Sequence, residues 1–260
     1  MNFILPQWNA PSSVRAFFTV RNGGVSDPPF ASFNLAANVG DEAGAVGENR
    51  MRLREHIPAS PKWMLQAHTA RAVRAEEIIA DTTVADAAYT FAANEVCAAL
   101  VADCVPVLFC TADGRGAAAA HAGWRGLAGG VLKSAADALR ENDKNEKLLA
   151  WLGPAISQAH YEIGEEVRAA LCETKEDEKY FIRAGEKWRA DLPKLAARRL
   201  RDLGIETTES GLCTSADRRH FFSARRDGVR SGRMAALIWT ETGKESESGK
   251  ELEAGENGEK

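Results

Sequence analysis

Short apolar runs punctuate the whole chain and divide it into candidate strands. Apolar runs of strand length occupy residues 16–20, 98–101, 105–109, 148–152 and 234–239. The first of these runs ends at the turn Asn22-Gly23-Gly24, and a run of small residues at 117–120 ends at His121. Residues 63–66 are also expected to be extended.

Amphipathic spacing predicts helices between these runs. Apolar residues three and four positions apart indicate helices over 43–57 and 127–139, and a further helix is expected from about Ser157. Another begins with Asp191 as its N-cap and ends before Gly204. Because helices and strands mix without a strict alternation, we expect an α+β protein: a single domain with a layered, mixed β-sheet flanked by helices.

The composition changes at residue 240. The following segment consists mainly of Glu, Lys, Ser and Gly, and Leu252 is its only large apolar residue. Such a segment buries too little surface to offset the entropy lost on ordering. We therefore expect residues 241–260 to form a disordered acidic tail. Residues 1–240 contain no linker or repeat and are expected to form one domain.

The charge balance of that domain excludes some partners. The 260-residue chain has 33 Lys and Arg against 37 Asp and Glu, but the tail alone holds seven Glu and three Lys. Residues 1–240 thus carry 30 basic and 30 acidic side chains, without the basic excess typical of nucleic-acid binders. We expect neither a nucleic-acid partner nor a membrane span, because no apolar stretch approaches roughly 20 residues.

Cellular location follows from the N-terminus and the cysteines. The first residues contain no basic region and no long apolar run, so a secretory signal is not expected. The five Cys are an odd number and form no CxxC motif. This pattern predicts free thiols in a reducing compartment, and we expect the protein to be cytoplasmic.

Three segments between residues 66 and 126 contain most of the reactive side chains, and each potential ligand follows or interrupts a short apolar strand. Strand ends are where side chains from different strands can converge. Two imidazoles and a thiolate, from His68, Cys104 and His121, form a plausible Zn²⁺ set that leaves a fourth position for water. The separations of 36 and 17 residues match no compact zinc finger. A buried thiol with two structural histidines therefore remains an alternative.

Cys104 and its neighbour Asp103 allow a second interpretation. A cysteine beside a histidine can be a nucleophile whose thiolate is stabilised by the imidazolium. Asp103 could orient a histidine or act as a general acid or base. Alternatively, its carboxylate could accept backbone N–H groups at a turn, as aspartates commonly do.

Several arginines near turns are candidates for binding an anion. Arg125 lies between two glycines just before a predicted helix, in His121-Ala-Gly-Trp-Arg-Gly, and Arg21 precedes Gly23-Gly24. The first of these strings could equally be a tight turn with Trp124 in the core. A further cluster of arginines comprises Arg225, Arg226, Arg230 and Arg233. Arginine suits bidentate phosphate binding, but a charge cluster near a turn is more often simply solvated.

Missing motifs exclude several enzyme classes. The chain contains neither of the glycine-rich phosphate-binding fingerprints, GxGxxG and GxxxxGK[ST]. The zinc-deaminase signature HxE…PCxxC is absent too. Five histidines without an HxH pair are too few for a four-copper oxidase site.

In ordered combination, the motifs resemble the YfiH family, also called the laccase-domain or multicopper polyphenol oxidoreductase family. Val105 and Ala224 are mild departures, because family members usually have Leu after the cysteine and Tyr-Arg-Arg near the end. The resemblance rests on Thr19–Ser26, Ser32–Leu35, Asn38–Asp41, Asn49-Arg50, Gln66–His68, Ala102–Leu108, His121–Gly126, Gly153–Ile156, Tyr161–Gly164 and Phe222–Arg226.

The resemblance implies a single α/β domain with Zn²⁺ (alternatively Cu²⁺) bound by His68, Cys104 and His121. It implies phosphorolysis of purine nucleosides (adenosine, inosine, guanosine, methylthioadenosine) and deamination of adenosine. On this basis we expect a monomeric enzyme with purine nucleoside and phosphate as substrates. Cys104, His121 and Asp103 are the expected catalytic residues, and Arg21 and Arg125 the expected phosphate-binding residues.

The same family leaves other activities open. Bacterial members are described as peptidoglycan editing factors that remove L-Ser from UDP-MurNAc-L-Ser, for which Cys104 or a zinc-bound water would attack a carbonyl. A copper-dependent polyphenol oxidase is a further alternative. A non-catalytic protein with a structural zinc is the last, although structural zinc sites normally have four protein ligands.

Overall fold

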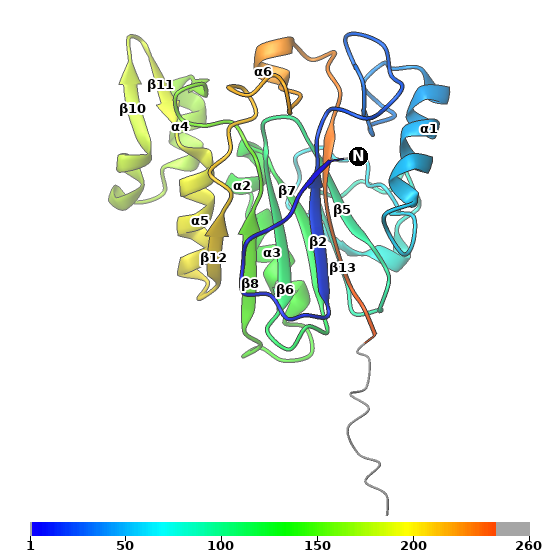
Figure 1. Cartoon of the computed structure of the whole chain (residues 1–260). Coiled ribbons are helices and arrows are strands. Elements are labelled where there is room, and N and C mark those ends of the chain that lie inside the picture. The colour runs from blue at the N-terminus through cyan, green and yellow to red at the C-terminus, as the bar shows by residue number, and fades with distance from the viewer. Residues whose placement is uncertain (1, 243–260) are drawn as a thin grey trace, which may run out of the picture.

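The computed structural model describes residues 2–242, and the chain forms stacked sheets flanked by helices (Figure 1). The acidic tail predicted for 241–260 lies outside the described residues from 243 onward. Within residues 2–242, no helix has the length and apolar character needed to cross a lipid bilayer.

Residues 2–242 form thirteen strands, six α-helices and two 3₁₀ helices. The strands are β1 (Phe3–Ile4), β2 (Val14–Thr19), β3 (Ala72–Arg74), β4 (Ala87–Thr90), β5 (Cys97–Val101), β6 (Val105–Thr111), β7 (Ala117–Ala122), β8 (Leu148–Leu152), β9 (Glu162–Ile163), β10 (Phe181–Ala184), β11 (Lys187–Ala190), β12 (Glu206–Glu209) and β13 (Met234–Thr240). The helices are α1 (Ala43–Arg54), η1 (Ala75–Glu77), α2 (Trp124–Ala128), α3 (Val131–Leu139), α4 (Glu165–Leu171), η2 (Lys175–Tyr180), α5 (Leu192–Asp202) and α6 (Ala224–Asp227).

Two sheets form the centre of the molecule. A four-stranded sheet has the order β1-β2-β13-β5, and a six-stranded sheet has the order β12-β8-β6-β7-β4-β3. The six-stranded sheet is mixed, because β12 pairs with β8 and β3 with β4 in parallel while its other pairs are antiparallel. Strands β5 and β13 of the smaller sheet contact β6 and β7 of the larger one, so the sheets are stacked.

Side-chain alternation explains why the sheets are stacked. Both β6 and β13 are buried along their whole length, so each strand has an apolar face on either side. In β6, Leu108 packs between the two sheets, whereas Val107 and Phe109 face the helices on the other side. In β13, Ile238 packs between the sheets and Leu237 faces outward toward the layer of α1. These strands therefore need cover on both faces.

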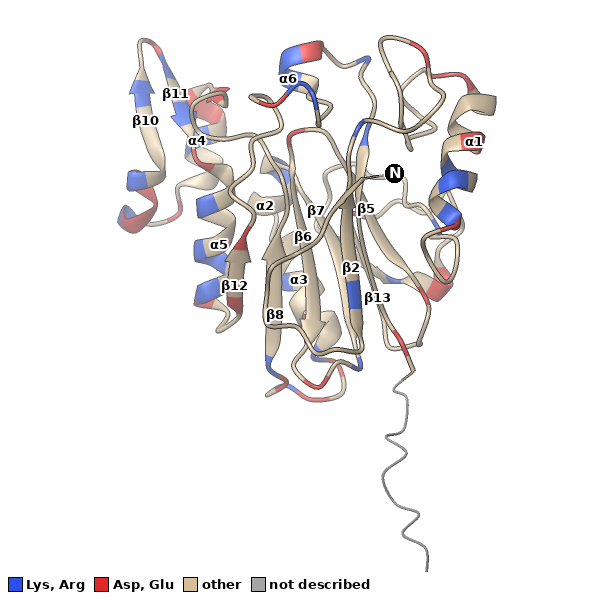
Figure 2. Cartoon of the chain, viewed as in Figure 1, with Lys and Arg blue, Asp and Glu red and all other residues tan. Residues whose placement is uncertain are grey.

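Helices provide that cover. The apolar sides of α3 and α5 belong to the same core as the outer face of the six-stranded sheet, and α1 contributes Leu53 to the core on the outer face of the four-stranded sheet. Figure 1 shows α5 and α1 on opposite flanks of the strands. Charged residues lie mainly on helices, loops and the other strands, whereas strands β5, β6, β7, β8 and β13 have none (Figure 2).

The fold class predicted from the sequence is confirmed, with three differences in detail. The strands form two stacked sheets and a small third sheet instead of one mixed sheet. The predicted helix 127–139 is two helices, α2 and α3, because Gly130 adopts a left-handed φ of 89° between them. No helix begins at Ser157: residues 157–160 form turns, and α4 begins only at Glu165.

A small sheet, β10-β11-β9, stands beside the main body together with α4 and η2. Asp177 is a buried polar residue in this part of the molecule. Its carboxylate accepts the backbone N–H groups of Glu173 and Thr174 at the start of η2, and it pairs with Arg198 of α5 at 2.6 Å. Burial raises the pKa of this carboxyl, but the hydrogen bonds from Thr174 and Arg198 outweigh burial, and the pKa lies below its ordinary 3.8.

We expect Asp177→Asn to lower the free energy of unfolding at pH 7 by about 1–3 kcal/mol, because it removes a buried charged acceptor. A carboxyl whose pKa is lower in the folded state than in the unfolded state stabilises the fold fully above the unfolded-state pKa. This stabilisation is lost as the pH falls through the folded-state pKa. The difference between wild type and variant in urea unfolding should therefore shrink below about pH 4. The matched control is Asp202→Asn, which removes the exposed carboxylate on the same Arg198. Equal losses in both variants would contradict this role of Asp177.

Candidate metal centre

Strand register brings Cys104 and His121 to the same edge of the stacked sheets. Cys104 lies in the turn that leads from β5 in one sheet to β6 in the other. His121 is the penultimate residue of β7, which pairs antiparallel with β6 so that Val105 lies opposite Ala122. The residue before β6 and the residue at the end of β7 therefore lie close together, as the strand-end argument predicts.

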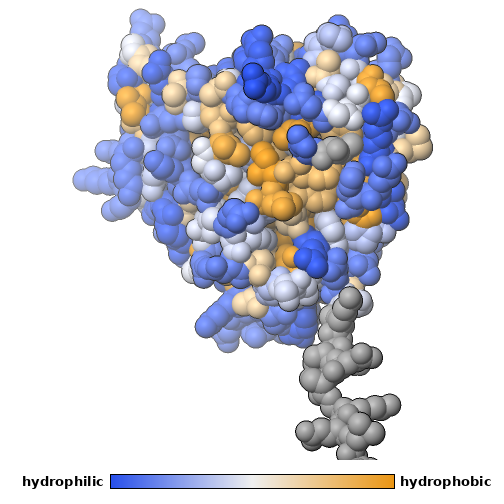
Figure 3. Space-filling view, in the orientation of Figure 1, coloured by the Kyte–Doolittle hydropathy of each residue, from blue (hydrophilic) through white to orange (hydrophobic). Residues whose placement is uncertain are grey.

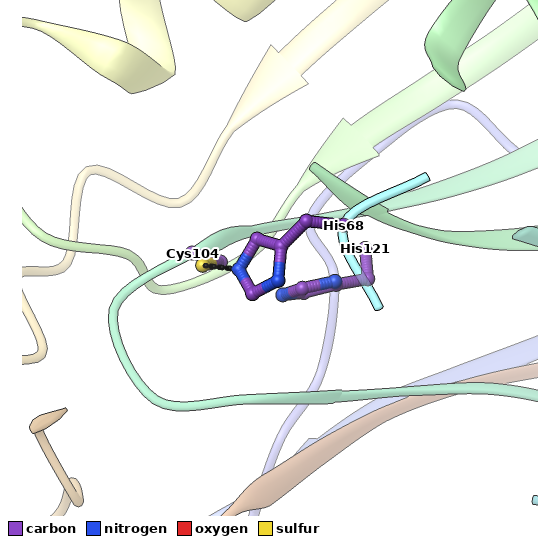
Figure 4. A group of neighbouring side chains, drawn as sticks. All are labelled: His68, Cys104 and His121. Carbon is purple, nitrogen blue, oxygen red and sulfur yellow. Dashed lines mark hydrogen bonds between the residues drawn. The ribbon is translucent and has the colours of Figure 1, made fainter. Parts of the chain in front are cut away.

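His68 completes the group from the segment before β3. Its Nε2 lies 3.7 Å from Cys104 Sγ, and its ring meets the His121 ring edge-on with centroids 4.8 Å apart (Figure 4). The candidate ligand atoms of the three residues lie within 4.8 Å of one another. His68 has a left-handed φ of 58°, an uncommon conformation that must be held by neighbouring contacts.

Asp86 provides those contacts. This fully buried carboxylate accepts the backbone N–H groups of Ala67, His68 and Thr69, and also the Thr69 hydroxyl. Its Oδ1 is 2.8 Å from His121 Nδ1. Since a carboxylate only accepts, Nδ1 carries a hydrogen, and Nε2 is the nitrogen that can give its lone pair to a metal once its own proton has left. Asp86 thus fixes the His68 backbone and the tautomer of His121 together.

Gly123, the residue directly after β7, allows His68 and Cys104 to pack closely against the backbone. A Cβ atom at Gly123 would overlap the His68 ring and lie 3.0 Å from Cys104 Sγ. Glycine is therefore required at this position of the His121–Gly126 motif, for close approach rather than for a special backbone angle.

The three groups shift one another's pKa values. Burial raises the pKa of the Cys104 thiol, but the charge and hydrogen bonds of His121 and His68 outweigh burial and lower it to about 6. Burial lowers the pKa of His121, but Cys104 and Asp86 raise it to about 9. Burial also opposes ionisation of Asp86, yet the hydrogen bonds from His121 and Thr69 lower its pKa to about 2.

This arrangement fits a metal ion. Thiolate and imidazole are the ligands that Zn²⁺ and other borderline metals take, and metal-bound histidines usually donate their second N–H to a carboxylate, as His121 does to Asp86. Within residues 2–242, this is the only group of three or more potential ligands. Three protein ligands leave a coordination position for water or substrate.

The group opens into a small cavity of about 250 Å³. Besides the three ligand residues, the cavity is lined by Ala36, Asn38, Val39, Met64, Gln66, Leu100, Val101, Ala102, Ala224 and Arg233. Most of these residues are apolar, with a few polar groups, which is the usual composition of a small-molecule site. A larger hollow of about 570 Å³, bordered by Thr111, Asp143 and Thr240, has no His or Cys in its lining.

Arg233 is the cation of this cavity. Its Nη1 donates to the Ser231 and Gly232 carbonyls and to the Ser231 hydroxyl, whereas Nε and Nη2 make no hydrogen bond to residues 2–242. Burial lowers the pKa of Arg233, and the negative charges of Cys104 and Asp103 act in the opposite direction. Sequence analysis gave Arg233 no preference over the other arginines of its cluster, and nothing in that pattern distinguishes it.

Asp103 has its carboxylate fully occupied. Oδ1 accepts the Thr214 hydroxyl at 2.6 Å, and Oδ2 accepts the Ser223 hydroxyl and the Arg225 N–H. Its φ is 91°, at the turn that presents Cys104. Of the two interpretations of Asp103, this geometry favours the carboxylate that organises a turn over the general acid or base.

The two arginines expected to bind phosphate differ in position. Arg125 is exposed and stacks on Trp124, with its guanidinium carbon 4.1 Å from the ring centroid. Burial and the Cys104 charge raise the pKa of Tyr161, and the charge of Arg125 opposes this rise only in part. Arg21 does not line the cavity: its guanidinium donates to the Ala31 and Arg218 carbonyls.

Comparisons with known proteins show the family of this chain. Residues 15–241 match the model of a family described as multi-copper polyphenol oxidoreductase laccase. The chain belongs to this family. Its relatives include the Escherichia coli purine nucleoside phosphorylase YfiH, 43% identical over 91% of this chain and 98% of the relative. A Pseudomonas aeruginosa purine nucleoside phosphorylase is 42% identical, over 91% of this chain and 98% of the relative.

Solved structures show the same fold in this laccase-like family. A Neisseria meningitidis protein, 40% identical, superposes with a TM-score of 0.88 and covers 93% of this chain and 100% of its own. The Bacillus licheniformis YfiH protein, 30% identical, has a TM-score of 0.81 and covers 88% and 93%. The resemblance stated from the motifs is therefore confirmed. The name of the matched family implies several copper ions, whereas residues 2–242 contain one group of potential metal ligands.

We expect Asp86→Asn to weaken metal affinity about 10- to 100-fold, because an amide no longer fixes the His121 tautomer or the His68 backbone. Competition against a chromogenic chelator measures this loss. The matched control is Asp217→Asn, which removes a carboxylate held 2.7 Å from another histidine, His220, outside the group. Unchanged affinity in Asp86→Asn would show that this carboxylate does not support the ligands.

In the metal-free protein, we expect iodoacetamide to modify Cys104 with a rate that rises through pH about 6, because only the thiolate reacts. Added Zn²⁺ should suppress this labelling at least tenfold, and a chelator should restore it. Peptide mass spectrometry reports each cysteine separately. Cys172, which lies outside the group, is the internal control whose labelling the metal leaves unchanged. Labelling of Cys104 at the same rate with and without metal would contradict its role as a ligand.

Proposed function

We propose that this protein is a zinc-dependent purine nucleoside phosphorylase that acts on adenosine, inosine, guanosine and methylthioadenosine. The observation that carries the proposal is the cavity in which Arg233 stands beside His68, Cys104 and His121. The names of relatives that share nearly their whole length with this chain support the same activity.

Zinc is the proposed metal because the donor set is two imidazoles and one thiolate. A zinc ion held there supplies a Lewis acid that polarises a substrate oxygen. The protein's part is to hold His121 in one tautomer through Asp86 and to keep Cys104 as a thiolate. Copper is the alternative metal, and metal analysis of the purified protein distinguishes the two.

Phosphorolysis mainly requires that an anion and a nucleoside be held in line. A phosphate oxygen forms a bond to C1′ as the bond from C1′ to the base nitrogen N9 breaks, and its electron pair leaves with the base. The proton of hydrogen phosphate ends on the departing purine through solvent. In the proposal, Nε and Nη2 of Arg233 bind phosphate in bidentate fashion, and Arg125 supplies a second positive charge from outside. Preorganised charge of this kind accounts for most of the rate in such reactions.

The other residues of the centre have distinct proposed roles. Cys104 and His121 are catalytic as ligands that touch the metal and face the cavity. Asp103 acts as a positioning residue through Ser223 and the Arg225 N–H. Deamination of adenosine is a second activity proposed for the same cavity, where His68, Cys104 and His121 would hold the metal that supplies the Lewis acid.

The deciding experiment measures base release from inosine and adenosine by protein of known metal content, with and without phosphate. We expect hypoxanthine, adenine and ribose 1-phosphate to form only with phosphate, and Cys104→Ala to lose at least 100-fold in rate. Cys172→Ala, a cysteine outside the group, should retain wild-type activity.

Each other result points to a different activity. Base release without phosphate would indicate a hydrolase, and ammonia release from adenosine would indicate the deaminase reaction. No turnover by protein that carries one zinc would overturn the phosphorylase proposal. The cell-wall precursor UDP-MurNAc-L-Ser would then be the next substrate to test.

Arg233→Met tests the phosphate site separately. We expect the KM for phosphate to rise at least tenfold while the KM for inosine changes less than threefold, because the substitution keeps bulk but removes the free guanidinium donors. Initial rates over a matrix of both substrates give the two constants. Arg201→Gln is the control, since Arg201 is exposed on α5 and does not line the cavity. A parallel rise in both constants would indicate a general distortion.

A further inference from the structure

A second concave region lies beside α6 and is separate from the metal cavity. It is a hollow of about 660 Å³ lined by Arg21, Asn22, Arg218, Arg219 and Asp227 together with residues of the 29–32 loop. The two hollows share no lining residue, and α6 joins them: Ala224 at one end of the helix lines the metal cavity and Asp227 at the other end lines this hollow. Figure 3 shows strongly hydrophilic surface over α6.

Positive charge exceeds negative charge around this hollow. Asp227 is the carboxylate among its lining residues, and it is already paired with Arg226 at 2.6 Å. Arg218 approaches the same carboxylate only to 3.8 Å, and its side chain is 73% exposed. The Arg219 guanidinium has no hydrogen bond or ion pair within residues 2–242. Arginine charge is thus left without a protein partner on one small surface.

The backbone that carries these arginines is held firmly. Arg21 donates Nη1 to the Arg218 carbonyl and lies over the Phe222 ring, 4.7 Å from its centroid. Asn22 Nδ2 donates to the Arg219 carbonyl at 2.8 Å. Asp217 accepts hydrogen bonds from the Arg219 and His220 N–H groups and from the His220 ring, and none from an arginine side chain. The loop is thus fixed, while the Arg219 guanidinium has no partner within residues 2–242 and the Arg218 guanidinium has only the 3.8 Å contact with Asp227.

We propose that this hollow binds a small ligand through an oligophosphate group, as in a nucleoside triphosphate or inorganic tripolyphosphate. Adjacent guanidinium groups suit several phosphates in a row, because each offers a planar pair of donors and stays charged at all physiological pH values. The neutral charge balance of residues 1–240 and the small size of the hollow favour a small ligand over a nucleic acid.

The hollow is connected to the metal centre through α6. Asp103, next to Cys104, accepts the Ser223 hydroxyl at the start of α6 and the Arg225 N–H within it. A ligand that contacts the far end of this short helix therefore acts on an element that is hydrogen-bonded to the Cys104 turn. The proposed site does not depend on the activity proposed for the metal cavity.

Isothermal titration of the full-length protein with sodium tripolyphosphate, ATP and adenosine tests the proposal. We expect saturable binding of tripolyphosphate and ATP with affinities within tenfold of each other, and at least tenfold weaker binding by adenosine. The variant Arg218→Gln/Arg219→Gln should weaken both phosphate ligands at least tenfold, and raised salt should weaken them in the wild type. Arg201→Gln removes an exposed arginine elsewhere and should bind as the wild type does.

Three outcomes would overturn the proposal. One is the absence of saturable binding by either phosphate compound at about 1 mM, a weak affinity even for a small ligand. Another is an equal loss in Arg201→Gln and the double variant, which would indicate only general electrostatic attraction. The third is displacement of tripolyphosphate by single-stranded RNA at equal phosphate concentration. Unfolding midpoints of all variants establish that the substitutions leave the fold intact.

Discussion

The carboxylate of Asp86 accepts hydrogen bonds from both sides of the candidate metal centre. On one side it holds the backbone of Ala67, His68 and Thr69, and on the other it holds Nδ1 of His121. A buried carboxylate is tolerated only where such donors replace its hydration. The geometry of two of the three ligands therefore depends on one side chain that never touches the cavity.

Local patterns in the sequence predicted the six longest strands and singled out His68, Cys104 and His121, which the fold brings together. Buried strands such as β6 and β13 are continuous apolar runs. Cys104 directly precedes β6, and His121 is the penultimate residue of β7. The strand-end argument works here because the antiparallel pairing of β6 and β7 fixes which ends meet. The helix that begins after Asp191 could also be predicted, because its N-cap and the proline in its first turn are local features of the sequence.

What the sequence did not predict depends on long-range packing. An apolar run indicates a strand but not the sheet to which that strand belongs. Two stacked sheets and one mixed sheet therefore could not be distinguished from the sequence. Asp86 precedes an apolar run like many other acidic residues, and only its partners on two other segments give it a role. Arg233 differs from its neighbouring arginines by burial beside Cys104, and that is a property of the folded chain. The turn at 157–160 similarly replaces the helix that local spacing favoured.

The attachment of all three ligand residues to one sheet has a thermodynamic consequence. Cys104 directly precedes β6, His121 lies near the end of its partner β7, and His68 comes shortly before β3 of the same six-stranded sheet. The three residues therefore meet only when strands that are distant in the sequence have paired. An ion held by all three would have no comparable site in the unfolded chain, and its binding energy would add to the stability of this sheet. Loss of the ion and separation of these strands would then be one linked equilibrium.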